Sequence, residues 1–136
     1  MAGPTAEITL RWKSGLVFTG GGKGRPAVTV DGDSKAGSSP VETLLIAAAS
    51  CTASDVVSIL EKQRVKLRSL DVEVKGQRRE EHPRRFTAIH FVWTIVGEGA
   101  DETKARRAID LSLEKYCSVV ASLAPDIRIS YDVAIA

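Results

Sequence analysis

The segment from Ser39 to Lys62 constrains the fold of this chain more than any other part of the sequence. Ser39 is a good helix N-cap, Pro40 suits the first helical position, and Glu42 stands where a capping box places its acid. Up to Ala53, small and apolar residues cover most of the helix circumference. The sequence therefore predicts a helix from Pro40 to about Lys62 whose first half is buried on several sides.

Alternating apolar and polar residues predict strands on both sides of this helix. The expected strands cover residues 8–12, 16–19, 27–30, 70–74, 86–96 and 127–135. The glycine cluster at 20–24 is expected to be a flexible hairpin connection, because no Lys-Ser or Lys-Thr pair follows it as in a phosphate-binding loop. The charged stretch from Gln77 to Arg85 is expected to form a solvated strand edge, with an anion-binding patch as the alternative.

A second helix is predicted from about Asp101 to Leu123. Apolar residues recur there at three- and four-residue spacing, and Pro125 follows. Strand groups segregated around two long helices are typical of an α+β domain. A length of 136 residues suits one hydrophobic core, so we expect a single domain over residues 1–136.

Composition excludes several classes of protein. The 19 basic and 17 acidic residues give a net charge of only +2, which argues against a nucleic-acid partner. The most apolar run, 44–49, is far shorter than the roughly 20 residues of a membrane span, so no membrane partner is expected. No secretory signal opens the chain, and no Cys or His lies at metal-ligand spacing from His82 or His90. A cytoplasmic protein with no bound metal is expected.

Two cysteines are the strongest candidates for chemistry. Cys51 lies deep in the first predicted helix and Cys117 on the apolar face of the second. Free cysteines are often inert core residues, and that interpretation fits both positions. In the other interpretation the helices cross so that the thiols face each other, one forming a sulfenic acid with an oxidant and the other converting it to a disulfide. Their separation along the sequence does not decide between the two.

The residues around both cysteines resemble a known family. SSPVETLLIAAASCTASDVVSIL and LEKYCSVVASL are similar to the two cysteine helices of the OsmC/Ohr family, which comprises osmotically induced protein C and the organic hydroperoxide resistance proteins. RREEHPRRFTAIHFVWTIVG resembles a less studied OsmC-like branch, and the resemblance covers nearly the whole chain. It implies an OsmC-like fold with antiparallel sheets wrapped around two long cysteine-bearing helices, in an intertwined homodimer.

The resemblance also implies an activity. Well-known members are thiol peroxidases that reduce organic hydroperoxides, and hydrogen peroxide less well, with a lipoyl-type dithiol as external reductant and no bound cofactor. Cys51 resembles the peroxidatic cysteine and Cys117 the resolving cysteine. The alternative is a non-catalytic module of the same fold that binds an apolar ligand at the dimer interface.

The expected supporting residues depart from the family pattern. Members pair the reactive thiolate with an N-terminal arginine, which is held by a glutamate directly after the helix-starting proline. Val41 occupies that position here, and the acid follows at Glu42. One residue rotates a helical side chain by about 100°, so Glu42 either supports the site or caps its own helix. Arg25 is the candidate arginine, and Arg11 is a weaker one.

Asp55 is the last candidate residue. It follows Cys51 by four residues and so lies on the same helical face. A nearby anion raises a thiol pKa unless a cation neutralises it. We therefore expect Asp55 either to anchor such a cation or to form a surface ion pair.

Overall fold

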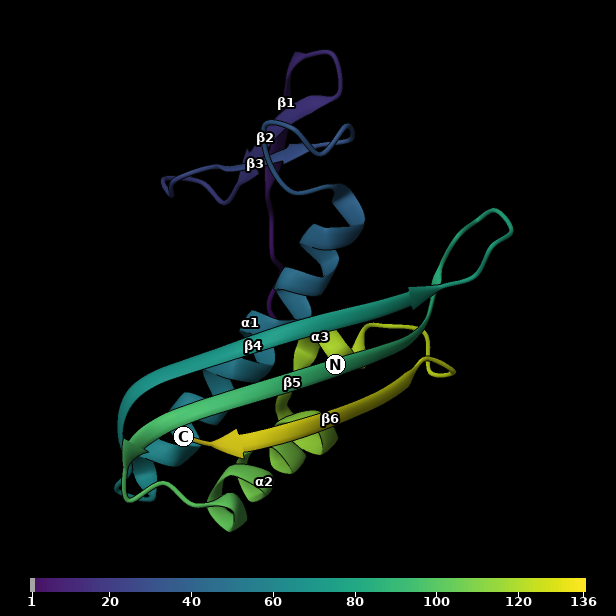
Figure 1. Cartoon of the computed structure of the whole chain (residues 1–136). Coiled ribbons are helices and arrows are strands. Elements are labelled where there is room, and N and C mark those ends of the chain that lie inside the picture. The colour runs from purple at the N-terminus through teal and green to yellow at the C-terminus, as the bar shows by residue number, and fades with distance from the viewer. Residues whose placement is uncertain (1) are drawn as a thin grey trace. The chain divides into compact units, whose positions relative to one another are not determined.

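The computed structural model describes residues 2–136 and contains two compact units, one ending at Leu44 and the other spanning Leu45–Ala136. The N-terminal unit holds an antiparallel sheet of β1 (Thr9–Ser14), β2 (Val17–Gly21) and β3 (Val28–Asp31), in that order. The C-terminal unit holds β4 (Lys66–Arg78), β5 (Phe86–Glu98) and β6 (Arg128–Ile135), also side by side in chain order (Figure 1). All six predicted strands are confirmed, and one domain over residues 1–136 stays a prediction.

The first predicted helix is confirmed as α1 (Pro40–Lys62). Its start is a reciprocal capping box, in which the Ser39 N–H donates to Glu42 Oε1 at 2.8 Å and the Glu42 N–H donates to Ser39 Oγ at 3.2 Å. Burial of α1 differs from the prediction. Its fully buried residues recur every four positions, at Ala48, Thr52, Val56 and Leu60, and Ile46 is 54% exposed. In the single chain, therefore, only one face of this helix is covered.

The sheet of the C-terminal unit is mixed, whereas antiparallel sheets were expected. β4 and β5 pair antiparallel, but β5 and β6 run parallel, with Phe91 opposite Tyr131. A parallel pair needs a crossover connection, which the helical segment between β5 and β6 supplies. One face of β5 is buried as its alternation predicts, through Ile89, Phe91, Trp93 and Ile95. The helix α2 (Glu102–Leu111) adds Ala105, Ala108 and Ile109 to this core.

The second predicted helix is broken, and this corrects the expectation of two long cysteine-bearing helices. After α2 comes a π-helical turn, η1 (Ser112–Tyr116), and then the short α3 (Ser118–Ala121). Cys117 lies between the last two with an extended backbone (φ −73°, ψ 101°). Its N–H donates to the Ser112 carbonyl, five residues back, at 2.8 Å. Ser112 continues the buried face of α2 and is fully buried, whereas the wider turn shifts the helical phase after it and Tyr116 is 58% exposed.

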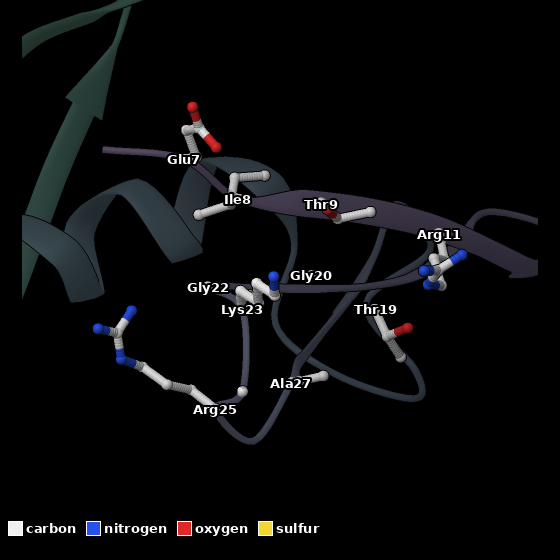
Figure 2. A pocket seen from close by; sticks show the side chains of 12 residues that line it. Glu7, Ile8, Thr9, Arg11, Thr19, Gly20, Gly22, Lys23, Arg25 and Ala27 are labelled. Carbon is white, nitrogen blue, oxygen red and sulfur yellow. The ribbon is translucent and has the colours of Figure 1, made fainter. Parts of the chain in front are cut away.

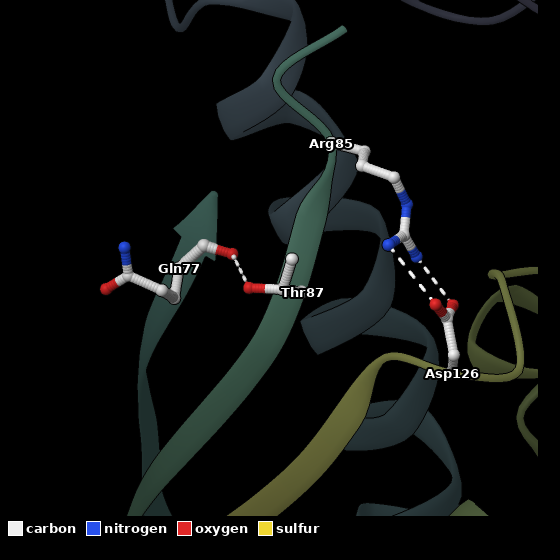
Figure 3. Close-up of polar contacts among 4 residues, drawn as sticks. All are labelled: Gln77, Arg85, Thr87 and Asp126. Carbon is white, nitrogen blue, oxygen red and sulfur yellow. Dashed lines mark hydrogen bonds and ion pairs between the residues drawn. The ribbon is translucent and has the colours of Figure 1, made fainter. Parts of the chain in front are cut away.

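The connection between β4 and β5 is exposed, as predicted for the charged stretch 77–85. Figure 3 shows two contacts that hold its base. The Thr87 hydroxyl donates to the Gln77 carbonyl at 3.2 Å, across the two strands. Arg85 forms a two-pronged ion pair with Asp126, with N–O distances of 2.6 and 3.3 Å. This pair ties the hairpin to the turn that precedes β6.

Two further findings concern membranes and metals. By length and composition alone α1 could cross a membrane, a test that the core helix of a soluble protein also passes. Within residues 2–136, no group of three or more His, Cys, Asp or Glu side chains is placed to hold a metal ion. The absence of a membrane partner stays a prediction.

Candidate active site

The structure brings the two cysteines together. Cys51 projects from α1, and Cys117 lies at the break between η1 and α3. The hydroxyl of Thr52, the residue after Cys51, is 3.3 Å from Cys117 Sγ, and the Cys51 thiol is near enough to affect the Cys117 pKa. Both are free thiols, but Cys51 is half-buried whereas Cys117 is only 3% exposed. The pair is therefore unequal, with one accessible thiol and one enclosed thiol.

Two groups contact the sulfur of Cys117. The Val120 N–H donates to Sγ at 3.4 Å, so the side chain of Cys117 caps α3. The Thr52 hydroxyl also lies 2.9 Å from the Ala48 carbonyl. A hydroxyl has one hydrogen, so while Thr52 donates it to Ala48, its oxygen is left to accept the S–H of Cys117. If Cys117 loses its proton, the same hydroxyl can turn and donate to the thiolate.

The surroundings raise the pKa of the Cys117 thiol above its ordinary value. Burial is the largest cause, because removing a thiolate from water is unfavourable. The hydrogen bonds from Thr52 and Val120 act in the opposite direction, and the neighbouring Cys51 thiol raises the pKa further. Cys117 therefore stays protonated at neutral pH, which makes it a poor first nucleophile.

Asp55 is bound to a hydroxyl. Its Oδ2 accepts a hydrogen bond from Ser112 Oγ at 2.8 Å, and no ion pair within residues 2–136 includes it. The two expected roles of Asp55, a cation anchor and a surface ion pair, stay predictions. The hydrogen bond itself has a simple physical reason: the buried Ser112 hydroxyl needs an acceptor, and Asp55 supplies one. The contact joins α1 to the first residue of η1.

The remaining candidates lie in the N-terminal unit. Glu42 caps its own helix, and the hydrogen bonds from Ser39 hold the pKa of that carboxyl below its ordinary value. Arg25 follows the glycine cluster, where its N–H donates to the Gly22 carbonyl at 3.2 Å. The Arg25 guanidinium lies over Gly22, in the space that a Cβ atom would otherwise take. The role of Arg25 stays a prediction.

Both candidate arginines border one pocket of the N-terminal unit. It has a volume of about 440 Å³, and Arg11, Lys23 and Arg25 supply its cationic groups, against the single acid Glu7. Figure 2 shows Arg11 and Arg25 at opposite ends of the view, with the glycine-rich turn between them. Lys23 is a third cation at this pocket that the sequence reasoning did not single out.

Two polar residues beside the cysteines were also missed. Thr52 has a signal in the sequence, since it directly follows Cys51 and carries a hydroxyl. Ser112 has a weaker signal: it lies three residues after Ile109, on the apolar face of the predicted helix, but nothing in the sequence indicates its partner. His90 lies in a half-exposed polar cluster, 2.7 Å from Ser130 Oγ and 3.0 Å from Asp132 Oδ2.

Comparisons with known proteins agree with this architecture. The family model described as OsmC-like protein matches residues 31–132. Protein YhfA from Escherichia coli K12 is 40% identical over 133 residues, which covers 96% of this chain and 99% of YhfA. A hypothetical protein from Aquifex aeolicus VF5 is 31% identical, with a TM-score of 0.84 over 98% of both chains.

A more distant structure shows the same fold. The organic hydroperoxide resistance protein OhrB of Bacillus subtilis superposes with a TM-score of 0.61 at 14% identity, over 96% of this chain and 98% of OhrB. Together, the match over most of the sequence, the similarity to YhfA and the shared architecture show that this chain belongs to the OsmC/Ohr family.

Proposed function

We propose that the protein is a thiol-dependent peroxidase that reduces organic hydroperoxides, and hydrogen peroxide less well. The observation that carries the proposal is the pairing of an accessible Cys51 with an enclosed Cys117. Membership of the OsmC/Ohr family supports a role in oxidative-stress or hydroperoxide resistance. A reactive thiol beside a second cysteine is the usual arrangement of a redox-active pair.

The proposed reaction has three steps. The Cys51 thiolate attacks the terminal peroxide oxygen, so that an S–O bond forms and the O–O bond breaks; the alkoxide that leaves takes a proton from water and becomes the alcohol. Cys117 Sγ then attacks the sulfur of the Cys51 sulfenic acid; an S–S bond forms, the S–O bond breaks, and the oxygen leaves as water with the Cys117 proton. An external dithiol of the lipoyl type reduces the disulfide by exchange. The cycle needs no bound cofactor.

The order of attack follows from exposure and protonation. Cys51 is half-buried and can meet a peroxide, whereas Cys117 is almost fully enclosed. Burial also raises the pKa of Cys117, which keeps that thiol protonated until the second step. Both properties favour Cys51 as the peroxidatic cysteine and Cys117 as the resolving cysteine.

We propose that the working unit is a homodimer. Leu10 and Trp12 alternate along β1, Ile8 precedes the strand in the same alternation, and each is more than half exposed. An exposed apolar patch of this kind is typical of an interface. In this proposal Arg25 supplies the cation that stabilises the Cys51 thiolate, and Glu42 contributes only by capping α1. No ion pair within residues 2–136 engages Arg25, so its guanidinium is available for this role.

We further propose a cytoplasmic location. Each cycle starts with both thiols reduced, and the cytoplasm is the compartment that keeps protein thiols in that state. The dithiol reductant of the third step is expected in the same compartment.

Intact-mass measurement tests the activity directly. Reduced protein is mixed with one equivalent of cumene hydroperoxide and, separately, of hydrogen peroxide. The expected product is a chain lighter by about two daltons, formed faster with the organic oxidant, since disulfide formation removes two hydrogens. Cys51→Ser should prevent any change, and Cys117→Ser should stop at a chain heavier by about 16 daltons, the sulfenic acid. An unchanged mass in the wild-type protein would contradict the peroxidase and favour the module that binds an apolar ligand.

A further inference from the structure

Three helical segments meet at the cysteine pair, and one side chain of α1 is hydrogen-bonded to η1 beside it. Asp55 lies on α1, four residues after Cys51, and accepts the hydrogen bond of Ser112 Oγ at 2.8 Å. Ser112 is the first residue of η1 and is fully buried. The same residue uses its carbonyl to accept the N–H of Cys117 at 2.8 Å. Asp55, Ser112 and Cys117 thus form a continuous chain of contacts from the helix that carries Cys51 to the backbone of Cys117.

We propose that Asp55 is a positioning residue for disulfide formation, which fixes Ser112 and through it the π-turn that presents Cys117 to Cys51. This chain of contacts is defined here as the Asp55 latch: Asp55, Ser112 and the backbone N–H of Cys117. The inference deepens the proposed function, because it assigns the latch to the resolving step of that cycle.

The geometry explains why a latch is needed at this place. A π-turn is rare and encloses one more residue in its hydrogen-bonded ring than an α-turn. The helical spacing of the local sequence favours a continuous α-helix, so a contact from outside the segment is needed to hold the π-turn. A continuous helix would rotate Cys117 by about 100° relative to its observed direction. The Asp55–Ser112 bond connects residues 57 positions apart and so ties the turn to the helix that carries Cys51.

The latch acts on the second step and not on the first. Asp55 bonds to Ser112, and the sulfur of Cys117 is contacted by Thr52 and Val120 instead. Loss of the latch leaves the side chain of Cys51 on an intact α1 but lets Cys117 move. In the resolving step Cys117 Sγ must approach the Cys51 sulfur in line with the S–O bond that breaks. A small displacement of Cys117 Sγ therefore slows this step strongly.

A reaction without peroxide separates this proposal from the proposed function. The probe is the aromatic disulfide 5,5′-dithiobis(2-nitrobenzoate). The Cys51 thiolate attacks it, which forms a mixed disulfide and releases one thionitrobenzoate; Cys117 then attacks Cys51, which forms the protein disulfide and releases the second. The first phase depends on probe concentration and reports Cys51 reactivity. The second phase is intramolecular and reports the position of Cys117.

The variants are Asp55→Ala, Asp55→Asn and Ser112→Ala, with Glu61→Ala as the matched control on an exposed position of the same helix. We expect Asp55→Ala and Ser112→Ala to slow the second phase about tenfold or more without slowing the first phase. Asp55→Asn should rescue most of the second phase, because its amide oxygen still accepts from Ser112. Glu61→Ala should match the wild type in both phases.

Two results would overturn the inference. One is a second phase unchanged in Asp55→Ala and Ser112→Ala. The other is an equal slowing of both phases, which would mean that Asp55 acts on Cys51 reactivity or on global stability. A wild-type protein that completes both phases but fails to reduce cumene hydroperoxide would contradict the peroxidase while leaving the latch intact.

Discussion

Replacing Thr52 by valine tests how the enclosed thiol is controlled. Thr52 is fully buried, and valine has nearly the same shape, so the substitution removes a hydroxyl without opening a cavity. The Ala48 carbonyl keeps its helical N–H partner, and Cys117 Sγ keeps the Val120 N–H at 3.4 Å. We therefore expect Thr52→Val to lower the free energy of unfolding by about 1 kcal/mol, the usual net value of one hydrogen bond. That loss corresponds to a Tm lower by about 4 °C for a chain of this size.

Thr52→Ser is the matched control. It keeps the hydroxyl and removes one buried methyl group, which also costs about 1 kcal/mol. The two variants should therefore be similarly destabilised at neutral pH. Only Thr52→Val removes a contact that lowers the pKa of Cys117, so only this variant should raise that pKa further.

The pH dependence separates the two variants. Above the unfolded thiol pKa of about 8.5, the folded state retains a proton that the unfolded state loses, so the free energy of unfolding falls as pH rises. This fall should extend to higher pH in Thr52→Val than in Thr52→Ser. The assay is urea denaturation across neutral and alkaline pH in a Cys51→Ser background, together with the ultraviolet absorbance of the thiolate. Identical titration curves for the two variants would refute the assigned role of the Thr52 hydroxyl.

Three further substitutions test the fold. Glu42→Ala should lower the urea midpoint at neutral pH, because the Ser39 N–H loses its acceptor. The pKa of Glu42 is lowered in the folded state, so its stabilising effect is lost in acid. The difference in midpoint from the wild type should therefore shrink as the pH falls below the ordinary pKa of 4.5. A difference that grows in acid would contradict the capping role. Leu60→Ala should lower the free energy of unfolding by about 3 kcal/mol in chemical denaturation, because Leu60 is fully buried. Ser58→Ala, at an exposed position of the same helix, should change it by less than about 0.5 kcal/mol. Equal effects of the two substitutions would refute the assigned core. Arg85→Ala should lower the free energy of unfolding by less than about 1 kcal/mol, and this effect should disappear at high salt. A loss of stability that does not depend on salt would show that the Arg85–Asp126 ion pair is not responsible.

Much of the fold was predictable because its signals are local. The strands follow from alternation within a few residues, and the start of α1 follows from a four-residue capping box. The OsmC/Ohr resemblance rests on continuous motifs around Cys51 and Cys117, and the comparisons confirm the family.

The break before Cys117 was not predictable, because its causes lie elsewhere in the chain. The segment from Glu102 to Ala121 keeps helical spacing and contains no glycine or proline. The π-turn is coupled to a hydrogen bond with Asp55, and that partner is 57 residues away in sequence. For the same reason the hydrogen bond of Asp55 was not predicted, because nothing in the sequence shows that the Ser112 hydroxyl reaches this carboxylate. The parallel pairing of β5 and β6 likewise depends on where the crossover places the last strand.

The meeting of α1 with the break before Cys117 also has a consequence for protein synthesis. Thr52 and Cys117 touch across 65 positions, so Cys51 leaves the ribosome well before the residues that surround its partner. At about 5–20 residues per second, a nascent chain carries Cys51 for several seconds without a resolving thiol. If Cys51 is the peroxidatic cysteine, as proposed, a sulfenic acid formed in that interval has no resolving thiol in its own chain, so it proceeds to further oxidation or to a mixed disulfide with another thiol. The proposed cycle therefore depends on chains that have already folded.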